Sequence, residues 1–475
     1  IPPDLVPACA GNPESCNRKS GNLCAQYAAR RSHLFFKNSG GAAGQAARAA
    51  PPLHAPARNP FMKHAGRACA SRRNHNNWHM TVTEFPSWPE TAPELIAVAA
   101  GRAFADTVIK GGIWVNVHSR ETLPDHDIAI AEGRIACVVP DASYCTGPDT
   151  KVIEARVRYM IPGLCDAHMH IESGMLTPAE FARAVIPHGT TSMFTDPHEI
   201  ANVLGLDGVR YMHDEALMQP VNIFTQMPSC APSAPGLETT GYEISAEDVA
   251  EAMSWPGIIG LGEMMNFPGV ANADPKMLAE IAATQNAGKT VGGHYASPDL
   301  GPGFAAYVAG GPADDHEGTC EADAIARVRQ GMRSMMRLGS AWYDVESQIT
   351  AVTEKGLDPR NFILCTDDCH SLTPGRRADV ILTSGLTDLP IELVIARGQV
   401  VAENGAITVD CPHYDWPASA RGTVHLGHQL TAKDFEISAP EGANAVTANV
   451  IGVVENQAPT KALKAELPVV DGLVE

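Results

Sequence analysis

The sequence is poor in aromatic residues and in basic charge, and it has no long apolar run. Only 6% of its 475 residues are aromatic, and 54 acidic residues outnumber 35 basic ones, giving a formal charge of −19. A general nucleic-acid-binding surface needs a basic face that displaces counterions from phosphates, so this charge argues against a nucleic-acid partner. No window reaches the ~18 uninterrupted apolar residues of a membrane-spanning helix, so we expect no membrane partner.

Paired cysteine spacings are also missing. The twelve cysteines are scattered, and several, such as Cys165, Cys230 and Cys365, lie inside apolar runs. This distribution predicts buried, reduced thiols in a cytoplasmic protein. What the chain does have is 44% hydrophobic and 19% charged residues, which excludes a disordered chain, a collagen and a disulfide-stapled miniprotein.

Residues 1–79 differ from the rest in charge and pattern. They contain eleven Lys and Arg against Asp4 and Glu14 only, so they carry +9, while residues 80–475 carry −28. They show no apolar period, which predicts a disordered or extraneous basic leader. An Arg-rich, acid-poor leader fits an organelle transit peptide. We favour the alternative that Met80 is the natural start and that the leader is upstream sequence.

The chain beyond the leader changes pattern near Gly163. From about Asp106, short apolar runs separated by Gly, Pro and Asp predict a β-module within residues 80–160. Five apolar runs then follow at 190–196, 221–229, 257–265, 289–296 and 361–368, with helical periodicity over 177–189, 245–255 and 274–288. Thr177 and Glu180 form a capping-box pattern. This alternation predicts a parallel α/β domain, either a doubly wound sheet or a barrel.

Residues of metal-binding types follow several of the predicted strands, and their placement favours the barrel. All strands of a (β/α)8 barrel end on one face, so side chains that are far apart in sequence can meet there. We therefore predict a (β/α)8 TIM-like barrel over residues 161–373. The residues at the strand ends are His168, His170, His198, Glu263, His294, His316, Asp367 and Asp368.

Each of these residues has an ordinary alternative interpretation. His168 and His170 point to the same face of a strand and can share one metal ion, but the spacing is also common by chance. Glu263 follows the apolar run GIIGLG, where a carboxylate needs a cation, an ion pair or a helix N-terminus. Asp367 and Asp368 also suit a turn. The recurrence of such residues at separate strand ends favours a metal site.

Asp196 and Pro197 make an ordinary helix start, so we expect no function for them. His198 is not needed for that start, and we expect it to orient substrate or move protons at the same face.

Several strings resemble the bacterial adenine deaminases of the amidohydrolase superfamily. They include PGLCDAHMHIES (162–173), DPHEIANV (196–203), PSCAPSAPGLE (228–238), GEMMN (262–266), LCTDD (364–368) and PGRRADV (374–380). The resemblance covers roughly residues 100–475. It implies hydrolytic removal of the 6-amino group of adenine in purine metabolism, and its first alternative is an amidohydrolase that acts on another cyclic amidine or amide.

The resemblance also implies a site with two divalent metals, Mn²⁺ or Fe²⁺ first and Zn²⁺ as an alternative. His168, His170 and one Asp of the 367–368 pair would hold one ion, His294 and His316 the other, and Glu263 would bridge them. Asp367, in preference to Asp368, would return a proton to the leaving amine, and His198 would stabilise developing charge. The expected purine contacts are Glu172, Ser229, Pro232 and Ser233. A homodimer is implied by resemblance only.

The sequence departs from the family pattern after Asp368. Only five residues separate it from PGRRADV, where the family has several dozen. We therefore expect an incomplete barrel, with residues 374–420 returning to a small β-sandwich module built from both flanks. Residues 421–475 would begin a truncated C-terminal domain. A catalytically inactive metal-binding remnant is the second alternative.

Overall fold

The computed structural model describes residues 86–339, 342–365, 378–454 and 460–474. The predicted leader and the Asp367–Asp368 pair lie outside these ranges. No helix among the described residues is both long and apolar enough to cross a membrane.

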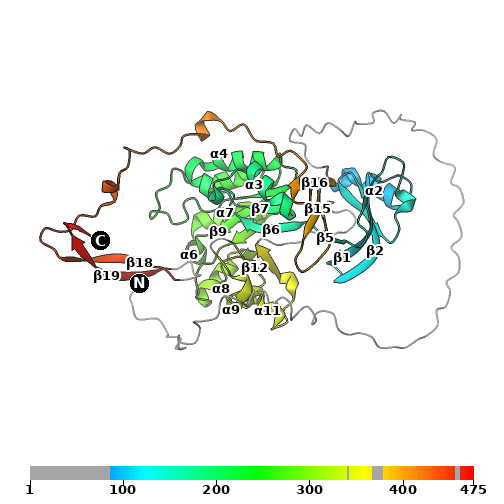
Figure 1. Cartoon of the computed structure of the whole chain (residues 1–475). Helices are drawn as coiled ribbons and strands as arrows, with labels where there is room; N and C mark the ends of the chain where they lie inside the picture. Colours follow the sequence, from blue (N-terminus) through cyan, green and yellow to red (C-terminus); the bar gives the residue numbers. More distant parts are fainter. Residues whose placement is uncertain (1–85, 340–341, 366–377, 455–459, 475) are drawn as a thin grey trace. The chain divides into compact units, whose positions relative to one another are not determined.

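A nine-stranded mixed sheet draws on both flanks of the barrel (Figure 1). Its strands are β1 (Thr107–Asn116), β2 (Glu121–Ala131), β3 (Arg134–Val139), β4 (Lys151–Glu154), β5 (Tyr159–Pro162), β14 (Val380–Thr383), β15 (Ile391–Ala396), β16 (Gln399–Glu403) and β17 (Ala406–Ile407). The flanks meet where β5 pairs antiparallel with β14, which sets Val380 opposite Pro162. Helix α2 (Trp88–Ala99) packs on β2 and β3 through Leu95 and Val98. The flanks therefore build one module, as expected.

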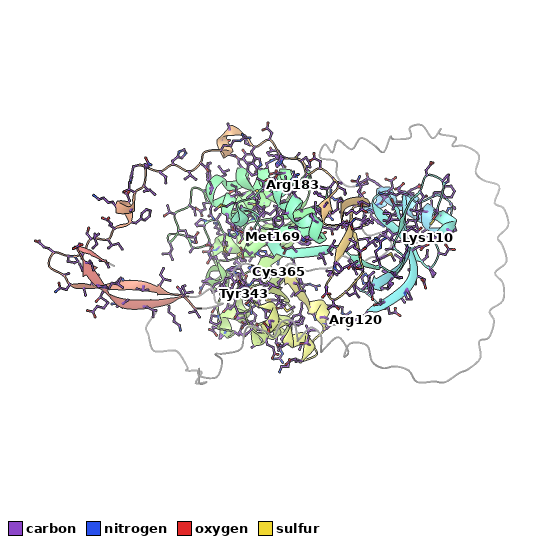
Figure 2. The ribbon with its side chains drawn as sticks, viewed as in Figure 1. Lys110, Arg120, Met169, Arg183, Tyr343 and Cys365 are labelled. Atoms are coloured by element: carbon purple, nitrogen blue, oxygen red, sulfur yellow. The ribbon has the colours of Figure 1, made fainter. Side chains whose placement is uncertain are left out.

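Eight parallel strands form the barrel, in two hydrogen-bonded groups. The first group is β6 (Leu164–Met169), β7 (Thr190–Thr195), β8 (Asn222–Met227), β9 (Ile258–Met264) and β10 (Thr290–Gly293), and the second is β11 (Asp314–Asp315), β12 (Arg333–Arg337) and β13 (Phe362–Cys365). Ala313 N–H donates to Val291 O, joining β10 to the start of β11. At the other seam β13 lies beside β6, and Cys365 and Ala167 share a core cluster. Figure 2 labels Met169 and Cys365, the last residues of β6 and β13.

Helices follow the strands around the barrel. They are α3 (Pro178–Val185), α4 (His198–Leu217), α5 (Ala246–Ala252), α6 (Phe267–Ala271), α7 (Pro275–Asn286), α8 (Pro302–Ala309), α9 (Glu321–Arg329), α10 (Val345–Gln348) and α11 (Thr350–Thr353). The largest core cluster lies between α4–α8 and the strands β8–β10, with Leu261 and Tyr307 fully buried. The segment after β13, where we expected a shortened βα connection, lies outside the described residues.

Two local expectations differ from the structure. The Thr177–Glu180 capping box is wrong, because the Thr177 hydroxyl donates to Glu215 Oε1 at 3.1 Å instead of capping α3. Strand β11 was expected only as the strand that ends before His316, and strand β12 was not predicted. Strand β11 is two residues long, and the sequence of β12, RSMMR, begins and ends with arginine.

The C-terminal segment has its own antiparallel sheet. Its strands are β18 (Ala445–Gly452), β19 (Lys461–Val470) and β20 (Leu473–Val474). Large apolar side chains such as Phe435, Ile451 and Val453 are exposed in this segment.

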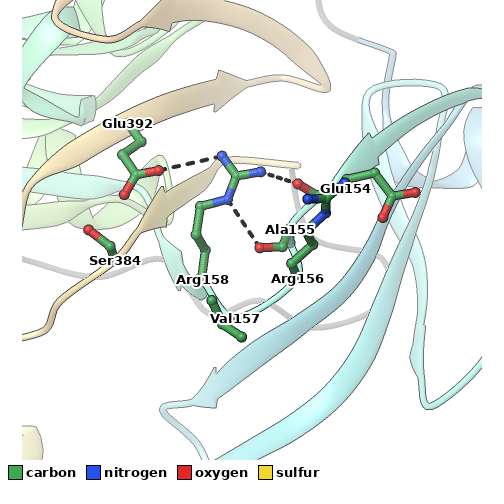
Figure 3. A pocket seen from close by; sticks show the side chains of 7 residues that line it. All are labelled: Glu154, Ala155, Arg156, Val157, Arg158, Ser384 and Glu392. Carbon is green, nitrogen blue, oxygen red and sulfur yellow. Dashed lines mark hydrogen bonds and ion pairs between the residues drawn. The ribbon is translucent and has the colours of Figure 1, made fainter.

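A pocket in the β-module is lined by the turn between β4 and β5 and by residues of the C-terminal flank (Figure 3). Arg158 donates to the carbonyl oxygens of Glu154 and Ala155 and lies 3.6 Å from Glu392 Oε2. The guanidinium thereby fastens the β4–β5 turn to β15. No histidine lines this pocket, so it does not match the predicted metal site. The candidate histidines lie at the ends of the barrel strands, here called the barrel rim.

Candidate metal centre

The Glu263 carboxylate, near the end of β9, is surrounded by imidazoles from four other segments. Its Oε2 atom lies 2.5 Å from His294 Nδ1 and 3.0 Å from His316 Nε2. Its Oε1 atom lies 3.1 Å from His198 Nδ1 and 3.4 Å from His170 Nε2. His168 Nε2 lies 3.9 Å from Oε2. Each oxygen therefore faces histidines of its own, as in a carboxylate shared by two ions.

His168 and His170 project from the end of β6 toward the same spot, with 3.1 Å between their Nε2 atoms. The Nδ1 atom of His170 lies 2.7 Å from the carbonyl oxygen of Asp196. Because a carbonyl can only accept, Nδ1 carries the proton and Nε2 presents a lone pair, as a metal-binding histidine does. Burial and then His316 lower the pKa of His168 well below its usual value, which also favours the neutral form.

The side chains around Glu263 are of the types that bind a divalent metal ion. Several groups of three histidine and carboxylate side chains have their ligand atoms within 4.8 Å of one another, including His168 with Glu263 and His316. Burial would raise the pKa of Glu263, but the surrounding histidines, His294 first, hold it well below its usual value. Without a metal, positive charge on these histidines keeps the buried carboxylate ionised, and a divalent ion at the same place would take over that role.

Asp196 holds Glu263 in place, which the sequence interpretation missed. Its Oδ2 atom accepts from Glu263 N–H at 2.8 Å, and it does not cap α4, whose N-cap is Pro197. A Cβ atom at Gly262 would lie 2.1 Å from that oxygen, so the glycine permits the contact. Burial raises the pKa of Asp196 to about 6. The expectation that Asp196 serves only as a helix start is therefore wrong.

His198, at the first turn of α4, lies between the Glu263 and Asp196 carboxylates. Burial opposes its charge, but the Glu263 carboxylate, 3.1 Å from Nδ1, and then the Asp196 charge raise the pKa of His198 to about 10. It is thus a cation beside the carboxylate.

Two further carboxylates flank the His170 side of the site. Glu172 Oε1 accepts from Ile200 N–H at 3.4 Å, and burial followed by the Glu199 charge raises the pKa of Glu172 to about 7. Glu199 Oε2 lies 3.6 Å from His170 Nδ1. Sequence reasoning missed Glu199, although it stands next to His198 in DPHEI.

The predicted purine contacts Ser229, Pro232 and Ser233 lie in the loop after β8, but their local surroundings differ. The Ser229 hydroxyl is buried and donates to the carbonyl oxygen of Glu263 at 2.6 Å, so its only proton is engaged by the protein. Ser233 bonds to the Glu238 carboxylate, and Pro232 follows a cis peptide bond. Asp367 and Asp368, the predicted strand-8 ligands, lie outside the described residues.

Two more neighbours of the site, Glu317 and Arg337, were not singled out from the sequence.

Comparison with known proteins points to one family. The model of the amidohydrolase family matches residues 159–319. The chain is 77% identical over 442 residues to an adenine deaminase of Ruegeria pomeroyi, covering 83% of this chain and 73% of that protein. Adenine deaminase 3 of Rhizobium meliloti is 58% identical over 434 residues, covering 82% of this chain and 73% of its own, and an adenine deaminase of Moorella thermoacetica is 44% identical over 431 residues, covering 81% and 72%.

The alignment with the Ruegeria protein has 442 positions, which is more than 83% of the 475 residues of this chain, the share that it covers. That relative therefore carries residues inside the aligned region that this chain lacks.

Proposed function

The chain belongs to the adenine deaminase family of amidohydrolases, and we propose that it hydrolyses the 6-amino group of adenine to give hypoxanthine and ammonia. The observation that carries this proposal is the Glu263 carboxylate, whose two oxygens face separate sets of histidines. The family uses divalent metal chemistry, and the side chains around Glu263 are of the types that bind such ions.

We assign the ligands of two ions, Mn²⁺ or Fe²⁺, as follows. His168 and His170 would hold one ion together with Asp367, and His294 and His316 would hold the other. Divalent ions, when bound, supply the Lewis-acid chemistry that makes water a nucleophile at neutral pH. Mixed imidazole and carboxylate ligands suit Mn²⁺ and Fe²⁺.

The residues around the ions manage protons and charge. Water adds at C6 of the ring, and ammonia leaves after its nitrogen gains a proton. Asp367 carries that proton to the leaving amine. His198 sits where a cation would stabilise the charge that develops on the ring, and the Glu263 and Asp196 carboxylates hold it there.

Acceptors for the substrate lie on the β6 side of the rim. Adenine offers N–H groups at its amine and ring, and a carboxylate can accept from them. Glu172 Oε2 is buried and has no hydrogen-bond partner among the described residues, which leaves it available for such a donor. Ser229, whose hydroxyl holds Glu263, contributes by positioning the carboxylate. Pro232 and Ser233 form the loop beside the ring.

Metal content and adenine turnover of the full chain test the proposal. We expect about two ions per chain and loss of adenine absorbance with ammonia release when Mn²⁺ or Fe²⁺ is supplied. Separate Glu263→Gln and His294→Asn variants should lose bound metal and slow turnover on the order of 10³-fold. Turnover of adenosine or of a hydantoin ring in place of adenine, or a metal-loaded but inactive protein, would contradict the proposal.

A cytoplasmic location and a homodimer complete the proposal. The described cysteines are free and mostly buried, as in a reducing compartment. The homodimer rests on the family resemblance, and light scattering of the purified chain would test it.

A further inference from the structure

Glu317 lies among the metal-binding histidines but has no place in the ligand set assigned above. Its Oε1 atom is 3.5 Å from His316 Nε2 and 3.8 Å from His294 Nδ1. The same two nitrogens face Glu263 Oε2. Glu317 therefore approaches the imidazoles on their ligating side, and its side chain is only 4% exposed.

Arg337, the last residue of β12, fixes this carboxylate. Its Nη1 atom bonds to Glu317 Oε1, and its Nε donates to Asp344 Oδ2 at 2.7 Å. The backbone of Asp344 also donates to Arg337 O at 2.9 Å, and the Trp342 ring lies 4.1 Å from the Arg337 Cζ atom. The guanidinium is therefore held on three sides and leaves Glu317 little freedom.

Glu317 and Asp344 share one guanidinium. Arg337 bonds to both buried carboxylates, whereas Arg327 of α9 pairs with Asp315. Buried carboxylates are stabilised by nearby cations. Since Glu317 lies within 4 Å of His294 and His316, a metal ion at those histidines would add a second cation beside it.

We propose that Glu317 is an additional ligand of the ion held by His294 and His316, and that Arg337 is the residue that positions it. The assignment rests on the metal site of the proposed function, not on the identity of the substrate. A carboxylate oxygen has lone pairs for both a guanidinium and a metal, and metal-binding carboxylates commonly carry such a second bond. Two imidazoles with two carboxylates also make the site harder, which favours Mn²⁺ or Fe²⁺.

Metal titration of the full chain tests the assignment without using activity. We expect Glu317→Gln to weaken binding of the second Mn²⁺ by about 10–100-fold and to leave the first ion bound. Arg337→Met should weaken binding of the same ion by a smaller factor. Arg337→Lys should recover part of that loss, because lysine restores the positive charge but not the forked donor geometry of the guanidinium. The matched control is Arg333→Gln on the same strand, where the arginine is exposed and bonds to Arg360 O, and it should bind both ions normally.

Thermal unfolding of the metal-free proteins separates a ligand from a structural partner. Without metal, Glu317→Gln should unfold at nearly the same temperature as the parent, because glutamine keeps an acceptor for Arg337 and Asp344 still pairs with the guanidinium. Wild-type affinity for both ions in this variant, or a metal-free form that is itself destabilised, would overturn the assignment. If the parent chain binds two ions but does not deaminate adenine, the proposed function fails while the ligand assignment stands.

Discussion

On the β10–β11 side of the barrel rim, side-chain acceptors are matched to donors. Asp315 accepts from Tyr295 N–H at 2.5 Å, from Glu317 N–H at 2.9 Å and from Arg327 Nε at 2.6 Å. Tyr307 accepts from His294 N–H and donates to Met264 O. These bonds tie three strand ends together, so the histidines on this side have a rigid base.

On the β6–β7 side, buried acceptors are left over. Glu172 Oε2, Glu199 Oε2 and Asp196 Oδ1 have no hydrogen-bond partner within the described part of the chain. A buried acceptor without a donor costs about 1–3 kcal/mol, so three of them in one place indicate a site kept ready for donors. The comparison teaches that metal-binding histidines lie on both sides of the rim, but that only the β6–β7 side keeps unpaired acceptors ready for a further ligand.

Among the residues that support the site, the largest effect is expected where the two sides meet, at Asp196. Asp196→Ala leaves Glu263 N–H without its acceptor, so we expect metal affinity and turnover to fall by about 10–100-fold. Asp196→Asn keeps an acceptor for that N–H and should retain both ions. Metal titration and adenine kinetics of the two variants measure this difference. Equal losses in both variants would show that the charge matters, not the hydrogen bond.

A smaller effect is expected from Glu172 on the ligand-receiving side. Glu172→Gln removes an acceptor for a substrate N–H, so we expect KM for adenine to rise by about tenfold while metal content stays unchanged. Steady-state kinetics with parallel metal analysis separate the two readouts. The comparison breaks down if this variant loses metal and keeps its KM, because Glu172 would then support a metal ion and not the substrate.

The sequence predicts the barrel strands where apolar runs are long enough. Strands β7, β8, β9, β10 and β13 fall inside the predicted runs. Strand β12 ends at Arg337, which reads as a solvated residue because the partners that bury it are 20 and 7 positions away. Long-range pairing of this kind leaves no local pattern, so the rigid base of the rim was not predictable.

The residues that gather around Glu263 stand out in the sequence more clearly than the residues that support them. The histidines and Glu263 can be recognised in the sequence, because they are metal-binding residue types at the ends of predicted strands. Asp196 does not, because an Asp before Pro197 also fits a helix start, and only the approach of Gly262 on another strand shows its role. Thr177 was misassigned for the same reason, since its partner Glu215 is 38 positions away.

The smallest effect on activity is expected at Glu280 of α7, a buried acid away from the rim. Both of its carboxylate oxygens lack a hydrogen-bond partner among the described residues, and Lys276 Nζ is 3.9 Å away. Burial, opposed by Lys276, raises the pKa of Glu280 to about 8. The folded state then holds this proton from about pH 4.5 to pH 8 while the unfolded state does not, so the free energy of unfolding falls as pH rises through this window.

Glu280→Gln should remove that fall, which we expect to reach a few kcal/mol by pH 9, and leave kcat/KM for adenine unchanged. Urea unfolding of both proteins at pH 6 and pH 9 measures the difference. An identical pH dependence in the variant would show that Glu280 is ionised throughout. A loss of turnover would show instead that an acid with unpaired oxygens serves catalysis even outside the rim, and the contrast between the two sides would no longer identify the ligand site.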